Sequence, residues 1–269
     1  VGIPMPATTG FATLQANLAA TVENTGWEFT LNTQNSRSKN FSWETAFNIT
    51  LPKTRVLEFP NLDSSSYQNQ YRIGQPLAIS LVYQYTGIDP QTGLYQFADI
   101  NGDGAITNPA DRQKVVSLDP KFYGGLQNNL RYKNWSLNFL FQFTKQKRQA
   151  FTMGNAGTMV NQPSALTDSW SAPGDNAGYQ IYTTGLNTAA VQSQYLYDSS
   201  DKAIVDGSFI RLKNIQVGYE LPLQDTLNCK IYFQGQNLLT FTPYSYGDPE
   251  FSLLGYLPPL KVYSFGVPV

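Results

Sequence analysis

The stretch FYGGLQNNLRYKNWSLNFLFQF, residues 122–143, decides the fold class. Its halves meet at Lys133 and Asn134, a two-residue turn typical of a β-hairpin. In the second half, large apolar residues alternate with mostly polar ones, and this period of two predicts a strand with two different faces. The apolar face carries Trp135, Leu137, Phe139, Phe141 and Phe143, and the polar face carries Ser136, Asn138 and Gln142. Five large apolar side chains in a row suit a strand that faces lipid.

The same alternation recurs along the chain and predicts seven strands that could span a membrane. They are residues 22–35, 41–53, 122–132, 135–147, 208–221, 229–240 and 259–269. The first two form a hairpin around a short turn, and so do the fifth and sixth. In the last strand Tyr263, Phe265 and Val267 share one face.

The composition fits a membrane setting. Charged residues make up 14% of the chain, the same share as aromatic residues, whereas soluble proteins average about 25% charged residues. No run approaches about 20 consecutive apolar residues, so any membrane spans must be strands.

The composition also excludes several functions. With a net charge of -1 and no long Lys or Arg run, nucleic acid is not expected as a partner. The absence of histidine excludes histidine-based catalysis and histidine-ligated zinc. The single cysteine, Cys229, cannot form an internal disulfide.

Short turns and long connections alternate between the predicted strands. The long connections are residues 54–121, 148–207 and 241–258. In outer-membrane barrels the short turns face the periplasm and the long loops face outside, so we expect extracellular long loops and a periplasmic C-terminus. Residues 71–86 also look like a strand, but they lie in the first long loop and are expected outside the membrane. The second long loop, rich in Gly, Ser, Asn, Gln and Tyr, fits a binding surface and a merely solvated loop equally well.

The number of predicted spans has a consequence for the extent of the barrel. Seven is odd, whereas a bacterial single-chain barrel has an even number of strands and both termini in the periplasm. An open sheet would also leave unpaired backbone groups in lipid at both edges, at a cost of several kcal/mol each. We therefore predict an all-β fold in which residues 1–269 are the C-terminal part of one transmembrane antiparallel β-barrel. The remaining strands would lie in residues not included here or on another chain.

A second motif, FADINGDGAITNPADR at residues 97–112, resembles a calcium loop. A D-x-N-x-D-G run places three side-chain oxygens on one side of a tight turn, and Ca²⁺ takes six or more oxygen ligands. The twelfth position, where an acid usually closes the site, is Ala110. The candidate ligands are the side chains of Asp99, Asn101, Asp103 and Asp111 and the carbonyl of Ala105. The alternative is a turn rich in Asn, Asp and Gly that binds no metal.

Five stretches spread over nearly the whole chain carry a family resemblance: VENTGWEF (22–29), YTGIDPQTGLYQFADINGDGAIT (85–107), GGLQNNLRYKNWSLNF (124–139), SFIRLKNIQVGYELP (208–222) and GQNLLTFTPYSYGDPE (235–250). They resemble the SusC-like TonB-dependent transporters of the Bacteroidetes outer membrane. The resemblance implies the C-terminal third of a barrel of about 22 strands, in a protein that also carries an N-terminal plug and a TonB box. It implies TonB-powered import of glycans, peptides or similar nutrients, beneath a SusD-like surface lipoprotein that closes over the extracellular loops. The family's acidic stretch corresponds to Asp99, Asn101, Gly102, Asp103 and Gly104, with the closing acid one residue late at Asp111.

Transport requires no covalent chemistry, so we expect no enzyme activity. One alternative is a soluble or surface-anchored glycan-binding β-protein, with its apolar faces buried in a sandwich or propeller and its loop aromatics stacked on sugars. Another is a hydrolase that uses Asp248 and Glu250 as paired carboxylates. Those two residues fit a loop turn equally well.

Overall fold

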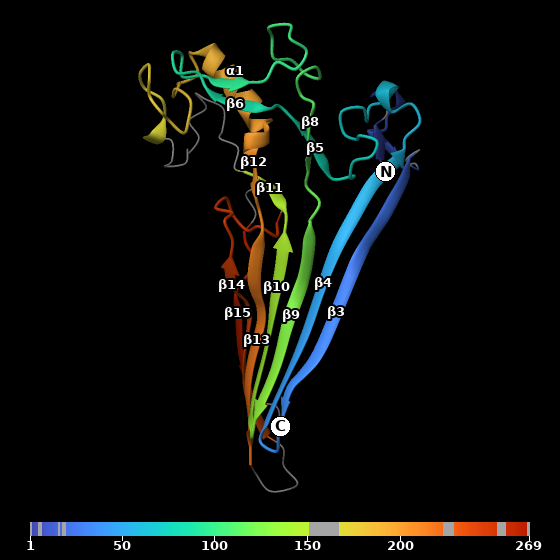
Figure 1. Ribbon diagram of the computed structural model, residues 1–269, viewed down its shortest axis with the longest axis vertical. Coiled ribbons are helices and arrows are strands. Elements are labelled where there is room, and N and C mark those ends of the chain that lie inside the picture. Colours follow the sequence, from blue (N-terminus) through green and yellow to red (C-terminus); the bar gives the residue numbers. More distant parts are fainter. Residues whose placement is uncertain are drawn as a thin grey trace.

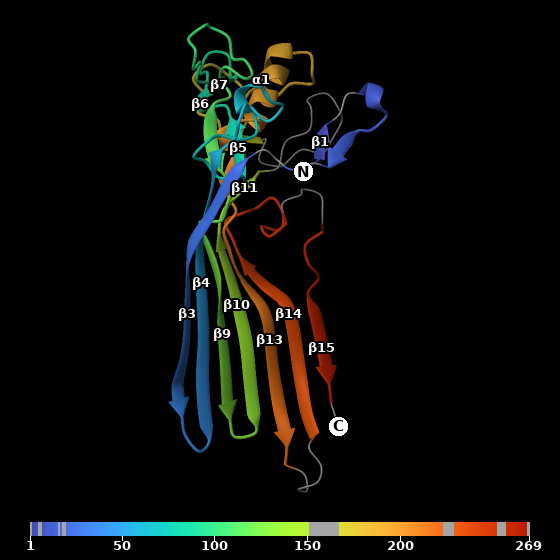
Figure 2. The same cartoon turned by 90° about the vertical axis from the view of Figure 1, so that its right-hand side faces the viewer.

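One antiparallel sheet dominates the computed structural model (Figures 1 and 2), which describes residues 2–4, 7–15, 17, 20–150, 167–222, 229–251 and 257–267. The order across the sheet is β15-β14-β13-β10-β9-β4-β3. The strands are β3 (Thr21–Arg37), β4 (Phe41–Glu58), β9 (Phe122–Tyr132), β10 (Trp135–Lys145), β13 (Phe209–Leu221), β14 (Cys229–Phe241) and β15 (Val262–Gly266). All seven predicted strands are therefore confirmed. The last one is shorter than predicted, because it begins at Val262 rather than at residue 259, and residues 268–269 lie outside the described part.

The two short turns that the structure describes, at residues 38–40 and 133–134, lie together at one end of the sheet, near the C-terminus, and the long connections lie at the other end (Figure 1). At the predicted two-residue turn, Lys133 has φ 52°, the left-handed conformation that such tight hairpin turns require. Its backbone N–H also donates to the carbonyl of Asn40 over 2.7 Å, which joins this turn to the neighbouring one. This tight turn thus favours the pairing of β9 with β10.

Strand register confirms the predicted apolar face. From β4 to β15, one row of paired residues contains only apolar side chains: Trp43, Leu130, Leu137, Val217, Phe233 and Phe265. On β3 the partner of Trp43 is Ser36. The adjacent row, nearer the short turns, is mostly aromatic: Phe41, Tyr132, Trp135, Tyr219 and Ile231. Aromatic bands of this kind flank the apolar belt of membrane barrels.

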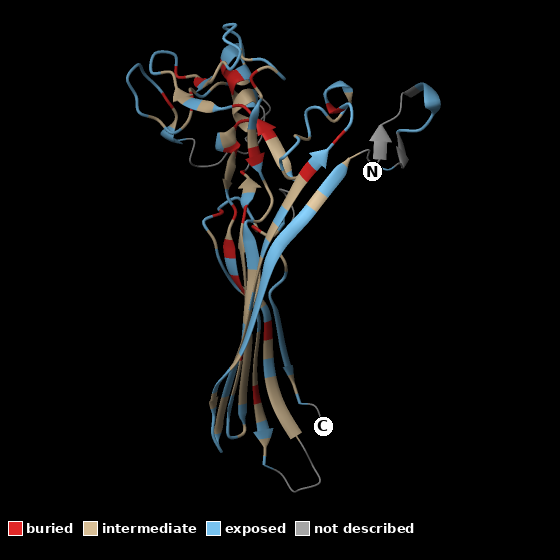
Figure 3. Cartoon of the chain, turned by 45° about the vertical axis from the view of Figure 1, so that its right-hand side comes forward, coloured by how far each residue is buried: buried red, intermediate tan, exposed pale blue. Residues whose placement is uncertain are grey.

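The sheet has little core of its own. Most buried side chains lie in the loops or on strand ends near them, as Val56, Phe209 and Arg211 do, whereas most strand residues are exposed or half-buried (Figure 3). On the apolar face Trp27 and Phe265 are each 71% exposed. Contiguous exposed apolar surface of this kind marks an interface with membrane or protein. In the part of the chain that the structure describes, no helix has the length and apolarity needed to cross a membrane.

The long connections contain small elements of their own. Strand β5 (Ile79–Val82) pairs with β8 (Lys114–Ser117), and β6 (Tyr85–Ile88) pairs with β7 (Tyr95–Phe97). The strand predicted at residues 71–86 is thus confirmed over its second half, as β5 and the start of β6. The other elements are β1 (Gly2–Pro4), η1 (Ala7–Thr9), β2 (Thr13–Gln15), η2 (Leu62–Ser64), α1 (Thr188–Asp198) and η4 (Asp201–Ala203).

One hairpin continues beyond the sheet. Strands β11 (Lys147–Gln149) and β12 (Ile204–Asp206) pair with each other. Thr144 pairs with Phe209 in the sheet, and Lys147 pairs with Asp206 beyond it. The pairing is interrupted between these two pairs, but the register offset is the same on both sides, so β11 and β12 continue the course of β10 and β13. The faces of the wall therefore continue into the loops.

Candidate functional site

The polar face of the sheet is the first part of the site. One row of paired residues crosses six strands and is polar throughout: Glu44, Asn129, Asn138, Gln216, Gln234 and Ser264. Amide side chains both donate and accept hydrogen bonds. This surface can therefore bind uncharged polar groups such as hydroxyls and peptide bonds.

A buried arginine attaches the third long connection to this face. Arg211 lies on the polar face of β13 and is 1% exposed. Its guanidinium contacts Asp248 and Glu250, each over 2.6 Å, and Nε donates to the hydroxyl of Thr240 over 3.0 Å. Nearby, Gln146 donates to the carbonyl of Pro249 over 2.7 Å. These contacts fix residues 248–250 against the wall.

The ion pairs also bear on the hydrolase alternative. Asp248 and Glu250 both engage Arg211, and Glu250 also contacts Lys213 over 3.1 Å. Both carboxylates therefore have a structural role. Sequence analysis did not single out Arg211, and the signal that could have found it is a lone arginine on the polar face of a predicted strand.

The first two long connections interlock into a cap over the end of the sheet (upper part of Figure 1). Asp201 is the main junction, because its carboxylate accepts the N–H of Tyr85 over 2.9 Å and pairs with Lys114 over 2.6 Å. The backbones of Tyr83 and Asp201 bond as well, over 2.9 Å. The two loops thus form one unit.

Aromatic rings fill the junction between these loops. Tyr95 is 4% exposed, and its ring stacks on that of Tyr197 at 4.2 Å between centroids. Burial raises the pKa of both phenols far above the usual value, so both stay neutral. Tyr182 and Tyr195, by contrast, are exposed. Tyrosines of the second long loop therefore divide between a packing role and an accessible surface.

The structure brings together the first three candidate calcium ligands. The Asp99 carboxylate accepts the N–H groups of Gly102 and Gly104, each over 2.7 Å. Both glycines have a positive φ, 73° and 84°, which this tight turn requires. The Asn101 amide donates to the Asp103 carboxylate over 2.8 Å, and the N–H of Ala105 donates to Asp103 over 2.8 Å. Exposed oxygens therefore gather on one turn, and this donor set suits a hard cation.

Asp111 lies beneath the turn and acts as its clasp. It is 1% exposed, and its carboxylate accepts the N–H groups of Thr107 over 2.8 Å and Ile100 over 2.7 Å. These bonds, with that from Thr107 the strongest, hold the pKa of Asp111 below its usual range. Within the described ranges no group of three or more His, Cys, Asp and Glu is arranged to hold a metal ion. Calcium binding stays a prediction, in which Asp111 would have to serve both as clasp and as ligand.

An antiparallel wall with one apolar face, one polar face and a cap of long loops is the architecture of a transmembrane β-barrel. No family model matches the sequence. TonB-dependent receptor P3 of Formosa agariphila is 31% identical over 92% of this chain and 27% of its own length. TonB-dependent receptor SusC of Bacteroides thetaiotaomicron is 23% identical over 92% of this chain and 26% of its own length.

The fold of this chain is also similar to part of a solved structure. The structure described as that of the RagAB peptide transporter matches with a TM-score of 0.78 and 23% identity, over 98% of this chain and 31% of that chain. This chain belongs to the SusC-like TonB-dependent transporters. It spans about 27% of the length of the first relative.

Proposed function

We propose that this chain forms part of the barrel wall and the loop cap of a transporter that imports nutrients such as glycans or peptides across the outer membrane. The observation that carries the proposal is the two-faced sheet. Its apolar rows suit lipid, while its polar row suits the lining of a passage for polar solutes.

The proposed orientation places the short turns and the C-terminus in the periplasm and the long loops outside the cell. The clustering of the short turns at one end supports it. In this orientation residues 54–121 and 148–207 form the extracellular cap, which a solute meets before it reaches the amide row.

The proposed partners are the remaining barrel strands, TonB acting on an N-terminal plug, outer-membrane lipid and a SusD-like lipoprotein that closes over the loops. Likeness to SusC and to a RagAB structure supports such an assembly. Both sheet edges, β3 and β15, end the described sheet without a neighbour, and further strands would satisfy their backbone groups.

The test of transport is uptake by cells that lack the gene for the whole transporter. Labelled oligopeptides and oligosaccharides are supplied separately as sole nutrients, and the intact gene is returned on a plasmid as a control. We expect at least one class to lose TonB-dependent uptake and regain it on complementation. Unchanged uptake of every nutrient tested would contradict the proposal.

The soluble glycan-binding alternative makes a different prediction. It requires the apolar rows to be covered by the protein itself, whereas Trp27 and Phe265 are largely exposed. Expression of the whole protein without detergent distinguishes the two, because a membrane barrel should stay in the membrane fraction and a soluble binding protein should not.

We further propose that Asp99, Asn101 and Asp103, with the Ala105 carbonyl and Asp111, bind a structural calcium ion. Calcium would stiffen the turn, and an affinity of about 10⁻⁴ to 10⁻³ M would suffice outside the cell. Proteolysis of the whole transporter with calcium and with chelator tests this proposal.

Calcium should protect residues 97–112 from cleavage, Asp103→Ala should abolish that protection, and Asp63→Ala in the same long connection should retain it. Identical digestion of the unaltered protein with and without chelator would contradict the calcium site.

No catalytic step is part of the proposed function. The relatives are named as receptors, and Arg211 engages the two carboxylates that suggested hydrolysis.

A further inference from the structure

A group of lysines lies where the apolar face ends at the loops. Lys145 pairs with Phe122, and this pair is the next one on the same face after Phe143 and Gly124. Beyond an interruption in the strand pairing, Lys147 pairs with Asp206, whose carboxylate contacts Lys145, so Lys145 and Lys147 lie near the same face. The outward apolar face is therefore followed, at the end with the long loops, by cationic side chains.

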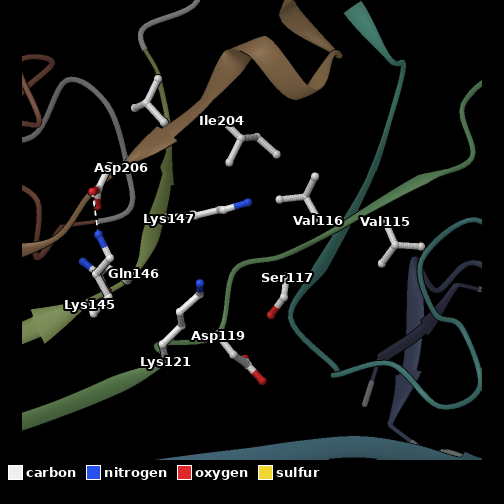
Figure 4. A pocket seen from close by; sticks show the side chains of 11 residues that line it. Val115, Val116, Ser117, Asp119, Lys121, Lys145, Gln146, Lys147, Ile204 and Asp206 are labelled. Atoms are coloured by element: carbon white, nitrogen blue, oxygen red, sulfur yellow. Dashed lines mark hydrogen bonds and ion pairs between the residues drawn. The ribbon is translucent and has the colours of Figure 1, made fainter. Parts of the chain in front are cut away.

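These lysines line a cavity of about 340 Å³ between β8, the start of β9 and the β11–β12 pair. Figure 4 shows the side chains of Lys121 and Lys147 pointing into the same space, and Lys145 turned toward Asp206. Val115, Val116 and Ile204 form apolar parts of the lining (Figure 4).

The charges leave this cavity positive. Lys145 pairs with Asp206 over 2.7 Å, and this contact lowers the pKa of Asp206 to about 2, so the Asp206 carboxylate is charged and is taken up by Lys145. Lys121 and Lys147 form no ion pair with any residue that the structure describes. The one further acid in the lining is Asp119. Two ammonium groups thus face a single carboxyl group, and the cavity suits an anion.

A second cavity adjoins the first one. It has a volume of about 390 Å³, and Lys145 belongs to the lining of both. Apart from Lys145, its large side chains are apolar: Phe122, Phe143, Phe209, Ile210, Phe241 and Pro243. A basic cavity and an apolar cavity that share one lysine together suit an amphiphile with an anionic headgroup.

We propose that the two cavities bind a lipid of the membrane's outer leaflet that bears phosphate on its headgroup, with the phosphate at Lys121, Lys145 and Lys147 and an acyl chain along Phe122, Phe143 and Phe241. The inference rests on the proposed function, because it needs the apolar face to lie in lipid with the long loops outside. Lysine ammonium groups bind phosphate as point charges, and basic groups at a membrane surface attract anionic headgroups.

The test uses the whole transporter, purified in detergent and examined by native mass spectrometry. The probes are diphosphorylated lipid A, the same lipid freed of phosphate, and inorganic phosphate. One variant combines Lys121→Gln, Lys145→Gln and Lys147→Gln, a second replaces the same three lysines by arginine, and a control carries Lys39→Gln and Lys133→Gln at the short-turn end.

We expect the glutamine variant to bind phosphorylated lipid at least about tenfold more weakly, since each lysine near a membrane surface contributes appreciably. The arginine variant and the control should bind like the unaltered protein, and the phosphate-free lipid should bind poorly. Equal binding of both lipids, binding of inorganic phosphate alone, or unaltered binding by the glutamine variant would each overturn the proposal. Uptake measured on the same variants separates this outcome from failure of the transport function, because loss of lipid binding with normal uptake concerns only the lipid site.

Discussion

At the scale of single residues, a few buried polar groups decide how the loops attach to the wall. Arg211 is buried between Asp248, Glu250 and Thr240. A buried charge is expensive unless it is paired, so removal of one partner leaves the others uncompensated. The few contacts of Arg211 should therefore contribute strongly to the free energy that holds residues 248–250 against the wall.

Arg211→Gln should release the third long connection from the wall. We expect the local free energy that holds this segment to fall by about 3 to 5 kcal/mol. Hydrogen exchange of residues 244–251 in the whole transporter measures it. Lys213→Gln is the matched control, because Lys213 is more exposed and contacts only Glu250, and it should change exchange much less. Equal effects of the two variants would contradict the role of Arg211.

Asp198 should weaken the cap at neutral pH. It is the last residue of α1, where a negative charge is unfavourable, and burial raises its pKa to about 6. For an acid with a raised pKa, the folded cap is most stable when the group is protonated, and stability falls as pH rises from about 4.

Asp198→Asn should remove that loss and keep the hydrogen bond from Gln194. At neutral pH we expect α1 to gain about 1 kcal/mol, after allowance for partial exposure. Hydrogen exchange of residues 188–198, compared with unaltered protein at each pH, measures the gain. Asp63→Asn should leave it unchanged, and faster exchange in Asp198→Asn would contradict the argument.

At the scale of elements, close strand packing depends on glycine at one position of β9. A Cβ atom at Gly124 would lie 2.1 Å from the Asn48 carbonyl oxygen and 2.7 Å from the ring of Phe143. At Gly125 a Cβ atom would make only ordinary contacts, the nearest at 3.4 Å from the Asn48 side chain. Gly124 thus has no space for a side chain, whereas Gly125 has enough for a methyl group.

Gly124→Ala should destabilise the folded barrel by about 1 to 3 kcal/mol, because the strands must move apart. Gly125→Ala should stay within about 0.5 kcal/mol of the unaltered protein. Urea unfolding of the whole transporter in lipid vesicles, followed by tryptophan fluorescence, gives both values. A larger loss of unfolding free energy for Gly125→Ala than for Gly124→Ala would contradict the close packing at Gly124.

The elements also show what sequence could reveal. Alternation located all seven strands of the sheet, because each has one face of a single kind over most of its length, as in residues 135–143. The polar row of paired residues from Glu44 to Ser264 could not be predicted from the sequence, because the register of each strand pair depends on the packing of the whole sheet. Helix α1 was missed because tertiary contacts such as the Tyr95–Tyr197 stack carry it rather than an amphipathic pattern.

The candidate site was predicted only in part for a related reason. Asp99, Asn101 and Asp103 are close in sequence, so their convergence on one turn could be read from the motif. The clasp formed by Asp111 depends on the backbone of Ile100 and Thr107, and the roles of Arg211 and Lys121 depend on residues far away in the chain. Spacing alone carries no information about such contacts.

At the scale of the whole molecule, one sheet with two unlike faces underlies both the transport proposal and the lipid site. Its apolar rows and its polar row lie on opposite faces of the same strands, and the cap and the lysine cavity lie at the end with the long loops. If the apolar face did not meet lipid, neither the transport proposal nor the lipid site would stand.

The most direct test measures lipid contact residue by residue along β10 and β13. Single cysteines replace Asn138, Phe139, Gln216 and Val217 in the whole transporter, with Cys229→Ser as background, and each carries a fluorophore in vesicles whose acyl chains bear nitroxide quenchers. We predict strong quenching at residues 139 and 217 and little at residues 138 and 216, because neighbouring side chains point to opposite faces. Equal quenching at all four positions, or the reverse pattern, would contradict the central claim.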